Sequence, residues 1–372
     1  MSVQRDNAET SQPGALDPAM FLYERYRDPQ ARSRTRQVYY RAKPLLPRPL
    51  QLSLRRAFVP IQRRQRFPAW PIEPILVQHD HERLLTLLRE SAAERVPLVS
   101  WWPDHKRFCF VLTHDVEGPA GVQNIEFVRE LEREYGFVSA WNFVAEDYSI
   151  PAGLFAQLRG EGCEVGLHGI KHDNSLFRDR QGFEAALPKI RDYLERWEAV
   201  GFRSPATHRN ADWMHELPCL YDSSFPDTDP FEPVPGGCCS IMPFFFGGVV
   251  ELPITLAQDH TLFEILRERS IDRWVQKANW IIENHGLINV IIHPDYMLSS
   301  TRFDRYRELL ELLSRRSDGW HDLPRNVARW WTERVQLACR EDAGAVGLAG
   351  ATDFAASVSY AREQGGRIVF DV

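Results

Sequence analysis

Short apolar runs alternate with amphipathic segments along the chain from about residue 105 onward. In segment 122–135, Val122, Ile125, Val128 and Leu131 recur every three positions, which places them on one face of a helix. Strands that alternate with helices are typical of a parallel α/β fold, either an open sheet or a barrel. The predicted strands are 108–113, 138–144, 163–167, 249–253 and 287–292, and the predicted helices are 122–135, 182–200, 271–283 and 302–313.

The 372 residues allow one large domain with extensions, or two domains. No apolar run reaches the roughly 18–20 residues that span a bilayer, and the polar first residues do not resemble a secretory signal. Six cysteines without a Cys-x-x-Cys pair favour reduced thiols. These features predict a cytoplasmic protein. The predicted division is an Arg/Pro-rich extension (1–104), the α/β domain (105–325) and a C-terminal extension (326–372), whose tail from 343 is either strand–helix–strand or partly ordered.

Charge is concentrated in the segment 25–66. It contains twelve arginines and Lys43 against Asp28 alone, a net charge of +12 in a chain whose net charge is −6. Five prolines exclude one continuous helix. Such an arm either docks on anionic lipid headgroups or wraps over the acidic body of its own chain, and the second interpretation is the plainer one. No nucleic-acid-binding module accompanies it, so we do not expect a nucleic-acid partner.

Side chains that can act as acids, bases or metal ligands follow the apolar runs. In parallel α/β folds, reactive groups lie at the carboxyl ends of the strands, so these residues should meet at one rim of the sheet. They are His114, Asp115, Glu117, His168, His172, Arg203, His293 and Asp295.

His168 and His172 are four residues apart, a spacing that lets two imidazoles meet on one side. Zinc takes histidine nitrogens and accepts a carboxylate as a further ligand. On spacing alone, two surface histidines are the plainer interpretation. Their position directly after an apolar run favours a metal site.

Asp115 and Glu117 flank Val116 and should project to the same side, because side chains alternate along a strand. One carboxylate can ligate a metal while the other takes a proton from water. Two solvated acids in a capped loop are the alternative. Arg203 can pair with one carboxylate and keep it ionised, and His293 can protonate a leaving group.

Together these segments resemble the polysaccharide deacetylase family, the NodB-homology carbohydrate esterases. The matching motifs, in the family's order, are Thr113-His-Asp-Val-Glu117, His168 to His172, Arg203-Ser-Pro205 and Val290-Ile-Ile-His293. They cover about residues 108–296. Each motif is weak alone, but four in order are fairly specific.

The resemblance implies a distorted (β/α) barrel, a divalent metal, most often zinc, and hydrolysis of an N-acyl group on an amino sugar. Asp115 then matches the catalytic base, and Arg203 matches its partner. His168 and His172 match metal ligands, and His293 matches the catalytic acid. Pro205 belongs to the Arg-x-Pro motif, and Tyr296 follows the last motif as a pocket-lining residue, so both are candidate substrate-binding residues.

The chain departs from the family pattern at several positions. Val116 stands where the family has a metal-binding aspartate, and Glu117 is the natural substitute, although Asp115 and Glu117 could exchange roles. Gly169 replaces a hydroxyl residue, and Ala206 replaces an aromatic residue. The aspartate that orients His293 is open among three candidates, of which we select Asp222; the other two are Asp227 and Asp229.

We therefore expect a metal-dependent hydrolase that deacetylates an amino sugar or glycan intermediate. Hydrolysis of a formylated sugar or a non-sugar amide is one alternative, and a catalytically silent glycan-binding or assembly protein is another. A cytoplasmic enzyme of this kind would serve surface-polysaccharide assembly on a nucleotide-linked or lipid-linked sugar, with residues 25–66 holding it at the inner membrane face. The sequence does not predict the oligomeric state.

Overall fold

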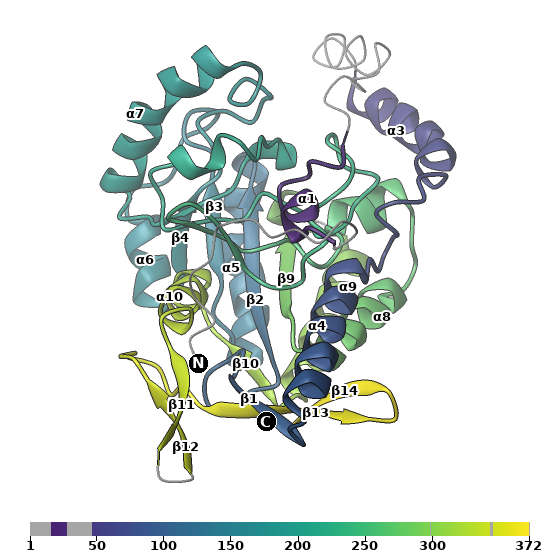
Figure 1. Cartoon of the computed structure of the whole chain (residues 1–372). Coiled ribbons are helices and arrows are strands. Elements are labelled where there is room, and N and C mark those ends of the chain that lie inside the picture. The colour runs from purple at the N-terminus through teal and green to yellow at the C-terminus, as the bar shows by residue number, and fades with distance from the viewer. Residues whose placement is uncertain (1–15, 28–46, 298, 343–344, 372) are drawn as a thin grey trace.

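The computed structural model describes residues 16–27, 47–297, 299–342 and 345–371 (Figure 1). Its centre is a nine-stranded, mostly parallel sheet in the order β10-β2-β3-β4-β5-β6-β8-β7, and β9 pairs with β2. The sheet curls into a half-barrel. The strands are β2 (Phe108–Val116), β3 (Ala140–Phe143), β4 (Glu164–Leu167), β5 (Gly201–Phe202), β6 (Tyr221–Asp222), β7 (Phe244–Phe246), β8 (Val249–Glu251), β9 (Leu287–Ile292) and β10 (Gly319–His321).

Two central strands anchor the sheet because their sequences are mostly apolar. Every residue of β2 and of β9 is buried, as expected for parallel strands covered on both faces. These two strands pair in parallel from Cys109 with Leu287 to His114 with Ile292. The pairing brings the ends of two distant sequence motifs to the same edge of the sheet.

Amphipathic helices cover the sheet. Helix α5 begins at a proline, which suits the first helical position, and it buries Ile125, Val128 and Leu131 as their spacing predicts. Asp179 caps α7 by accepting a hydrogen bond from the Gly182 amide. The helices are α5 (Pro119–Glu134), α6 (Leu154–Gly160), α7 (Arg180–Arg196), α8 (Asp272–Glu283), α9 (Ser300–Ser314) and α10 (Pro324–Arg334). The α/β architecture and all nine predicted strands and helices are confirmed, with small shifts at their ends.

A second, three-stranded antiparallel sheet lies at the opposite end of the molecule from α7 (Figure 1). It joins β1 (Arg95–Val99) to β13 (Val358–Gln364) and β14 (Arg367–Asp371), and α4 (Ile75–Ser91) packs against it. Strands β11 (Ala338–Asp342) and β12 (Ala345–Ala349) form a hairpin. The described tail therefore contains strands and no helix, so the strand–helix–strand expectation is wrong. The boundaries at 104 and 326 stay a prediction, although this sheet combines segments from both extensions.

The described parts of the N-terminal extension bind the body of the same chain. After α1 (Pro18–Leu22), Glu24 is buried and forms an ion pair with Arg209. In α3 (Arg48–Gln62), Arg55 donates a hydrogen bond to the Phe231 carbonyl at 3.1 Å. This part of the basic segment thus wraps over its own chain, whereas residues 28–46 lie outside the described residues. Among the described helices, none combines the length and apolar character that crossing a membrane requires.

Candidate active site

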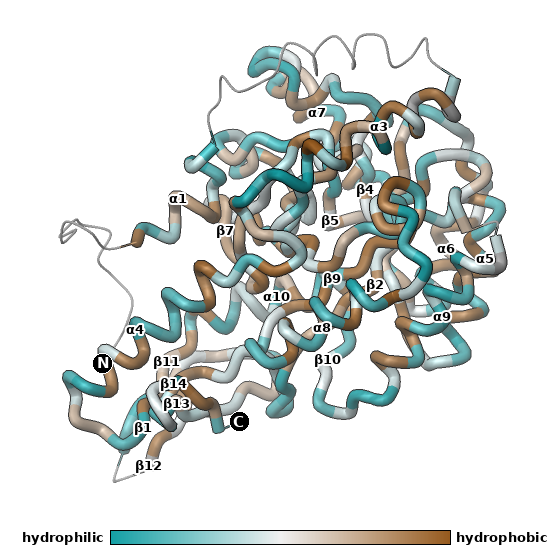
Figure 2. Tube along the Cα trace, turned by 90° about the vertical axis from the view of Figure 1, so that its right-hand side faces the viewer, coloured by the Kyte–Doolittle hydropathy of each residue, from teal (hydrophilic) through white to brown (hydrophobic). Residues whose placement is uncertain are grey.

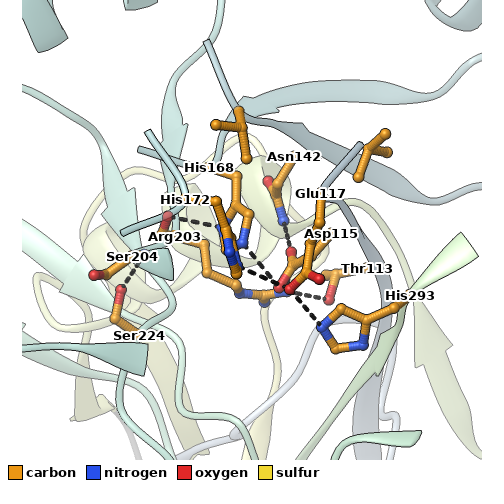
Figure 3. A network of polar contacts seen from close by, with 12 residues as sticks. Thr113, Asp115, Glu117, Asn142, His168, His172, Arg203, Ser204, Ser224 and His293 are labelled. Atoms are coloured by element: carbon orange, nitrogen blue, oxygen red, sulfur yellow. Dashed lines mark hydrogen bonds and ion pairs between the residues drawn. The ribbon is translucent and has the colours of Figure 1, made fainter. Parts of the chain in front are cut away.

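The reactive side chains predicted from the sequence converge at the carboxyl ends of β2, β4, β5 and β9 (Figure 3). Asp115 lies near the end of β2 and Glu117 just beyond it, while His168, Arg203 and His293 each directly follow their strands. His114 is the exception. Its side chain points to the other face of β2, where its Nε2 bonds Glu132 at 2.6 Å.

Asp115 is buried and held by two donors on one oxygen. Arg203 Nη1 and Asn142 Nδ2 each lie 3.0 Å from Asp115 Oδ1. Burial alone would raise the pKa of Asp115, but the Arg203 guanidinium, His168, His293 and the Asn142 hydrogen bond lower it to about 2. The carboxylate is therefore ionised at neutral pH, and its second oxygen, Oδ2, faces His168 Nε2 at 4.0 Å.

Arg203 is fixed from several directions. Its Nε donates to the Ser223 carbonyl at 2.8 Å, and its Nη2 donates to the Ser223 hydroxyl at 2.8 Å. Its Nη1 also donates to the Thr113 hydroxyl at 2.8 Å. The guanidinium is thus oriented before it meets Asp115, and the ion pair has a defined geometry.

Glu117, His168 and His172 bring one potential ligand atom each to within 4.8 Å of one another. His168 Nδ1 donates to the Arg203 carbonyl at 3.1 Å, because a carbonyl can only accept. Burial lowers the pKa of His168 to about 4, so its ring is neutral and Nε2 carries a lone pair. Although buried, Nε2 has no hydrogen-bond partner among the described residues. A buried lone pair beside a carboxylate and a second imidazole fits a divalent metal such as zinc.

Glu117 is positioned by the segment that follows β9. Tyr296 donates its hydroxyl to Glu117 Oε2 at 2.6 Å, and the Asp295 carboxylate accepts from the Glu117 backbone amide at 2.9 Å. His172 Nε2 lies 2.9 Å from Glu117 Oε1. Burial would raise the pKa of Glu117, but His172, His293 and Tyr296 hold it well below its usual value. Glu117 is the carboxylate that lies with the two histidines, whereas Asp115 is engaged by Arg203.

One ring nitrogen of His293, Nε2, faces Glu117, and the other, Nδ1, contacts Asp259. Its Nδ1 lies 2.6 Å from Asp259 Oδ1, and its backbone amide donates to Asp259 Oδ2 at 3.0 Å. Its Nε2 is 3.7 Å from Glu117 Oε1. Burial would lower the pKa of His293, but Asp259, Glu117 and Asp115 outweigh it and raise the pKa to about 10. The imidazolium can therefore act as a proton donor.

Comparisons with known proteins bear on the fold that carries this site. No family model matches the sequence, and no curated protein matches it. A Mycobacterium smegmatis protein assigned as a polysaccharide deacetylase superimposes with a TM-score of 0.51 at 18% identity, over 62% of this chain and 92% of that one. This is the polysaccharide deacetylase fold.

Two further solved structures align over the same 62% of the chain. A Pseudomonas aeruginosa PAO1 protein assigned as a polysaccharide deacetylase gives a TM-score of 0.47 at 16% identity, over 93% of its length. An allantoinase gives 0.46 at 15% identity, over 92% of its length. The superposition on the Mycobacterium smegmatis structure confirms the NodB-type barrel that the motifs predict.

Within this deacetylase fold, the selection of Asp222 as the residue that orients His293 is wrong. The Asp222 carboxylate accepts hydrogen bonds from the Ser224 amide and hydroxyl, at 3.1 and 2.7 Å. Asp259 occupies the orienting position instead. It lies eight residues after the end of β8, so the rule that polar residues directly after a strand form the rim does not reach it.

Pro205 is buried and packs against Gly169, which lies between His168 and His172 in the sequence. A Cβ at Gly169 would lie 2.7 Å from Pro205 Cδ, and the Gly169 φ of +68° favours glycine. Both residues line a cavity of about 130 Å³ together with Lys171 and Leu176. Both the conformation and the space at Gly169 therefore disfavour a hydroxyl residue. A substrate-binding role for Pro205 and Tyr296 stays a prediction.

Asn142 is the second functional residue that the sequence patterns missed. It lies inside β3, a predicted strand, so it did not stand out as a residue at a strand end. A Cβ at Gly166, on the neighbouring strand, would lie 2.1 Å from Asn142 Oδ1. Gly166 thus makes room for the Asn142 amide beside Asp115.

Proposed function

We propose that the chain is a metal-dependent hydrolase that removes an acetyl group from the nitrogen of an amino sugar, in a glycan or a glycan intermediate. The observation that carries this proposal is the meeting of three groups at one rim. They are an ionised carboxylate tied to an arginine (Asp115–Arg203), a metal-ligand set (Glu117, His168 and His172) and a charged histidine (His293).

The metal would be held by Glu117, His168 and His172. When bound, it supplies Lewis-acid polarisation of the amide carbonyl and a lowered pKa for water at the site. This pattern of nitrogen and oxygen ligands suits zinc, the metal that the motif resemblance implies.

The protein side chains divide the proton transfers. Asp115 accepts the proton of the attacking water on Oδ2, since Oδ1 is held by Arg203 and Asn142. His293 donates the Nε2 proton to the departing amine, and Asp259 on Nδ1 stabilises the charged ring before transfer. The amide C–N bond breaks, and the products are a free amino sugar and acetate.

Metal content tests the ligand set. Wild type and the variant His168→Ala/His172→Ala are loaded with zinc, desalted and measured by elemental mass spectrometry. We expect about one metal per wild-type chain and none in the variant. A double variant of two exposed histidines, His105→Ala/His215→Ala, is the matched control and should retain the metal. Equal metal in all three proteins would refute the assignment.

Acetate release tests the reaction. Asp115→Asn should retain the metal but lose turnover of acetylated amino-sugar oligomers, because the amide cannot accept the water proton. Wild-type turnover in this variant would refute Asp115 as the base. Hydrolysis rates for a panel that adds formylated sugars and cyclic amides show which acyl group the protein removes. Glycan binding without hydrolysis by metal-loaded protein would favour the silent-binding alternative.

A further inference from the structure

Helix α3 presents apolar side chains to solvent. Seven large hydrophobic residues are exposed in the described chain, and four of them lie between residues 50 and 67. Leu50, Phe58 and Ile61 are 45%, 41% and 60% exposed and stand eight and then three positions apart in α3, on one stripe of the helix. Phe67, 37% exposed, follows just beyond the helix.

The opposite face of α3 packs against the body of the same chain. Val59 is buried against Phe231 and Ile265 in a small hydrophobic cluster. Arg56 Nε donates to the Glu264 carbonyl at 2.9 Å, and Gln62 Nε2 donates to the Pro230 carbonyl at 3.0 Å. The exposed stripe is therefore not the face that holds α3 on the protein. Figures 1 and 2 both show α3 at the outer edge of the molecule.

The charge carried by this segment has one sign. Residues 47–72 contain six arginines and neither aspartate nor glutamate. Arg63, Arg64 and Arg66 are all exposed and follow the last turn of α3 directly. An apolar stripe bordered by arginines is complementary to a surface that is negative outside and apolar beneath.

We propose that α3 and the arginines 63, 64 and 66 dock the protein on an anionic lipid surface. Helices of this kind lie in the interface plane, with the apolar stripe at the boundary between headgroups and acyl chains and the basic residues among the headgroups. The absence of any acidic side chain in 47–72 favours a polyanionic surface over a protein partner of mixed charge. This proposal does not depend on the proposed reaction.

Docking would bring the candidate active site close to the lipid. Helix α3 packs on η4 (His260–Ile265), and η4 begins directly after Asp259, the partner of His293. Only α3 itself and one short helix therefore separate the docking face from the rim.

Vesicle co-sedimentation with the full chain tests the proposal. The probes are vesicles of equimolar phosphatidylcholine and phosphatidylglycerol, and vesicles of phosphatidylcholine alone. One variant, Leu50→Ser/Phe58→Ser/Ile61→Ser, removes the apolar stripe, and another, Arg63→Gln/Arg64→Gln/Arg66→Gln, removes the charge. The matched control, Leu87→Ser/Phe127→Ser, replaces two exposed hydrophobic residues outside α3, which are 45% and 47% exposed.

We expect wild type and the control to bind the anionic vesicles and not the neutral ones. Loss of the three arginines should weaken binding about a hundredfold, since each contributes about fivefold near an anionic surface. Loss of the stripe should weaken binding to a similar extent. Absence of binding by wild type, or binding by both α3 variants that equals that of wild type, overturns the proposal. Self-association of wild type that the stripe variant loses, without vesicle binding, overturns it in favour of an interface between copies.

Discussion

Gly169 is a position at which the structure makes a quantitative prediction. The substitution Gly169→Ala adds one methyl group between His168 and His172. The new Cβ would lie 2.7 Å from Pro205 Cδ and 2.8 Å from Pro205 Cγ, closer than Cβ atoms approach other carbons. Pro205 cannot swing aside like the end of a flexible side chain, because its ring is part of the backbone.

Two costs add at this position. A residue with a Cβ at φ +68° costs about 1–2 kcal/mol relative to glycine. Forcing a methyl group into a packed site costs about 1–3 kcal/mol more. The expected loss is therefore about 2–5 kcal/mol. At about 1.3 °C per kcal/mol for a chain of this length, the melting temperature should fall by about 3–6 °C.

Gly136→Ala is the matched control. Gly136 has a φ of +73°, but no atom lies within 4 Å of its added Cβ. This variant should show only the conformational cost, about 1–3 °C. The difference between the two melting temperatures then isolates the contact with Pro205. Because Gly169 separates two metal ligands, Gly169→Ala should also weaken zinc binding, whereas Gly136→Ala should not.

Calorimetry and zinc titration on both variants test the contact with Pro205 and its effect on zinc binding. If the two alanine variants melt at the same temperature, Pro205 moves away at no cost and the packing argument fails. If Gly169→Ala melts lower but binds zinc as wild type does, the contact is structural and does not position the ligands.

Three further changes have defined outcomes. Asp259→Asn should lower kcat about a hundredfold by weakening proton donation from His293, with zinc content unchanged. Asn142→Ala should lower kcat about tenfold, since it removes a charge-assisted hydrogen bond to Asp115, with a small effect on KM. Burial raises the pKa of Glu164 from 4.5 to about 7, so stability that is full below pH 4.5 is lost as the pH rises through 7. Glu164→Gln should therefore stabilise the protein by up to about 3 kcal/mol at pH 8 and hardly at pH 4.5, which melting curves at both pH values will show. Wild-type kcat in the first two variants, or the same gain at both pH values for the third, would contradict these expectations.

The rim of the sheet could be predicted from the sequence because its signal is local. An apolar run marks a buried parallel strand, and the polar residue after the run lies at its carboxyl end. This rule placed Asp115, His168, Arg203 and His293 together without any knowledge of strand order. It needed only that the strands be parallel.

The remaining features depend on contacts that no local pattern records. The pairing of β1 with β13 joins residues more than 250 positions apart, and both strands are short and partly exposed. Asp259 follows β8 at a distance of several residues, so it competes with other aspartates until the geometry is known. Asn142 looks like an ordinary strand residue, because its role follows from the register of β3 against Asp115.

The alternation of side chains along β2 explains how the chain can use an acid-x-acid pattern where its motif relatives have adjacent aspartates. Val116 is fully buried in the main hydrophobic cluster, on the face of β2 opposite to Asp115. An aspartate at this position would place its carboxylate in the core, away from His168. Glu117 lies just past the last strand residue, and its backbone amide is fixed by Asp295. Its longer side chain reaches His172. In the proposed function, the metal-binding carboxylate therefore lies one position further along the chain than in the motif that this segment resembles.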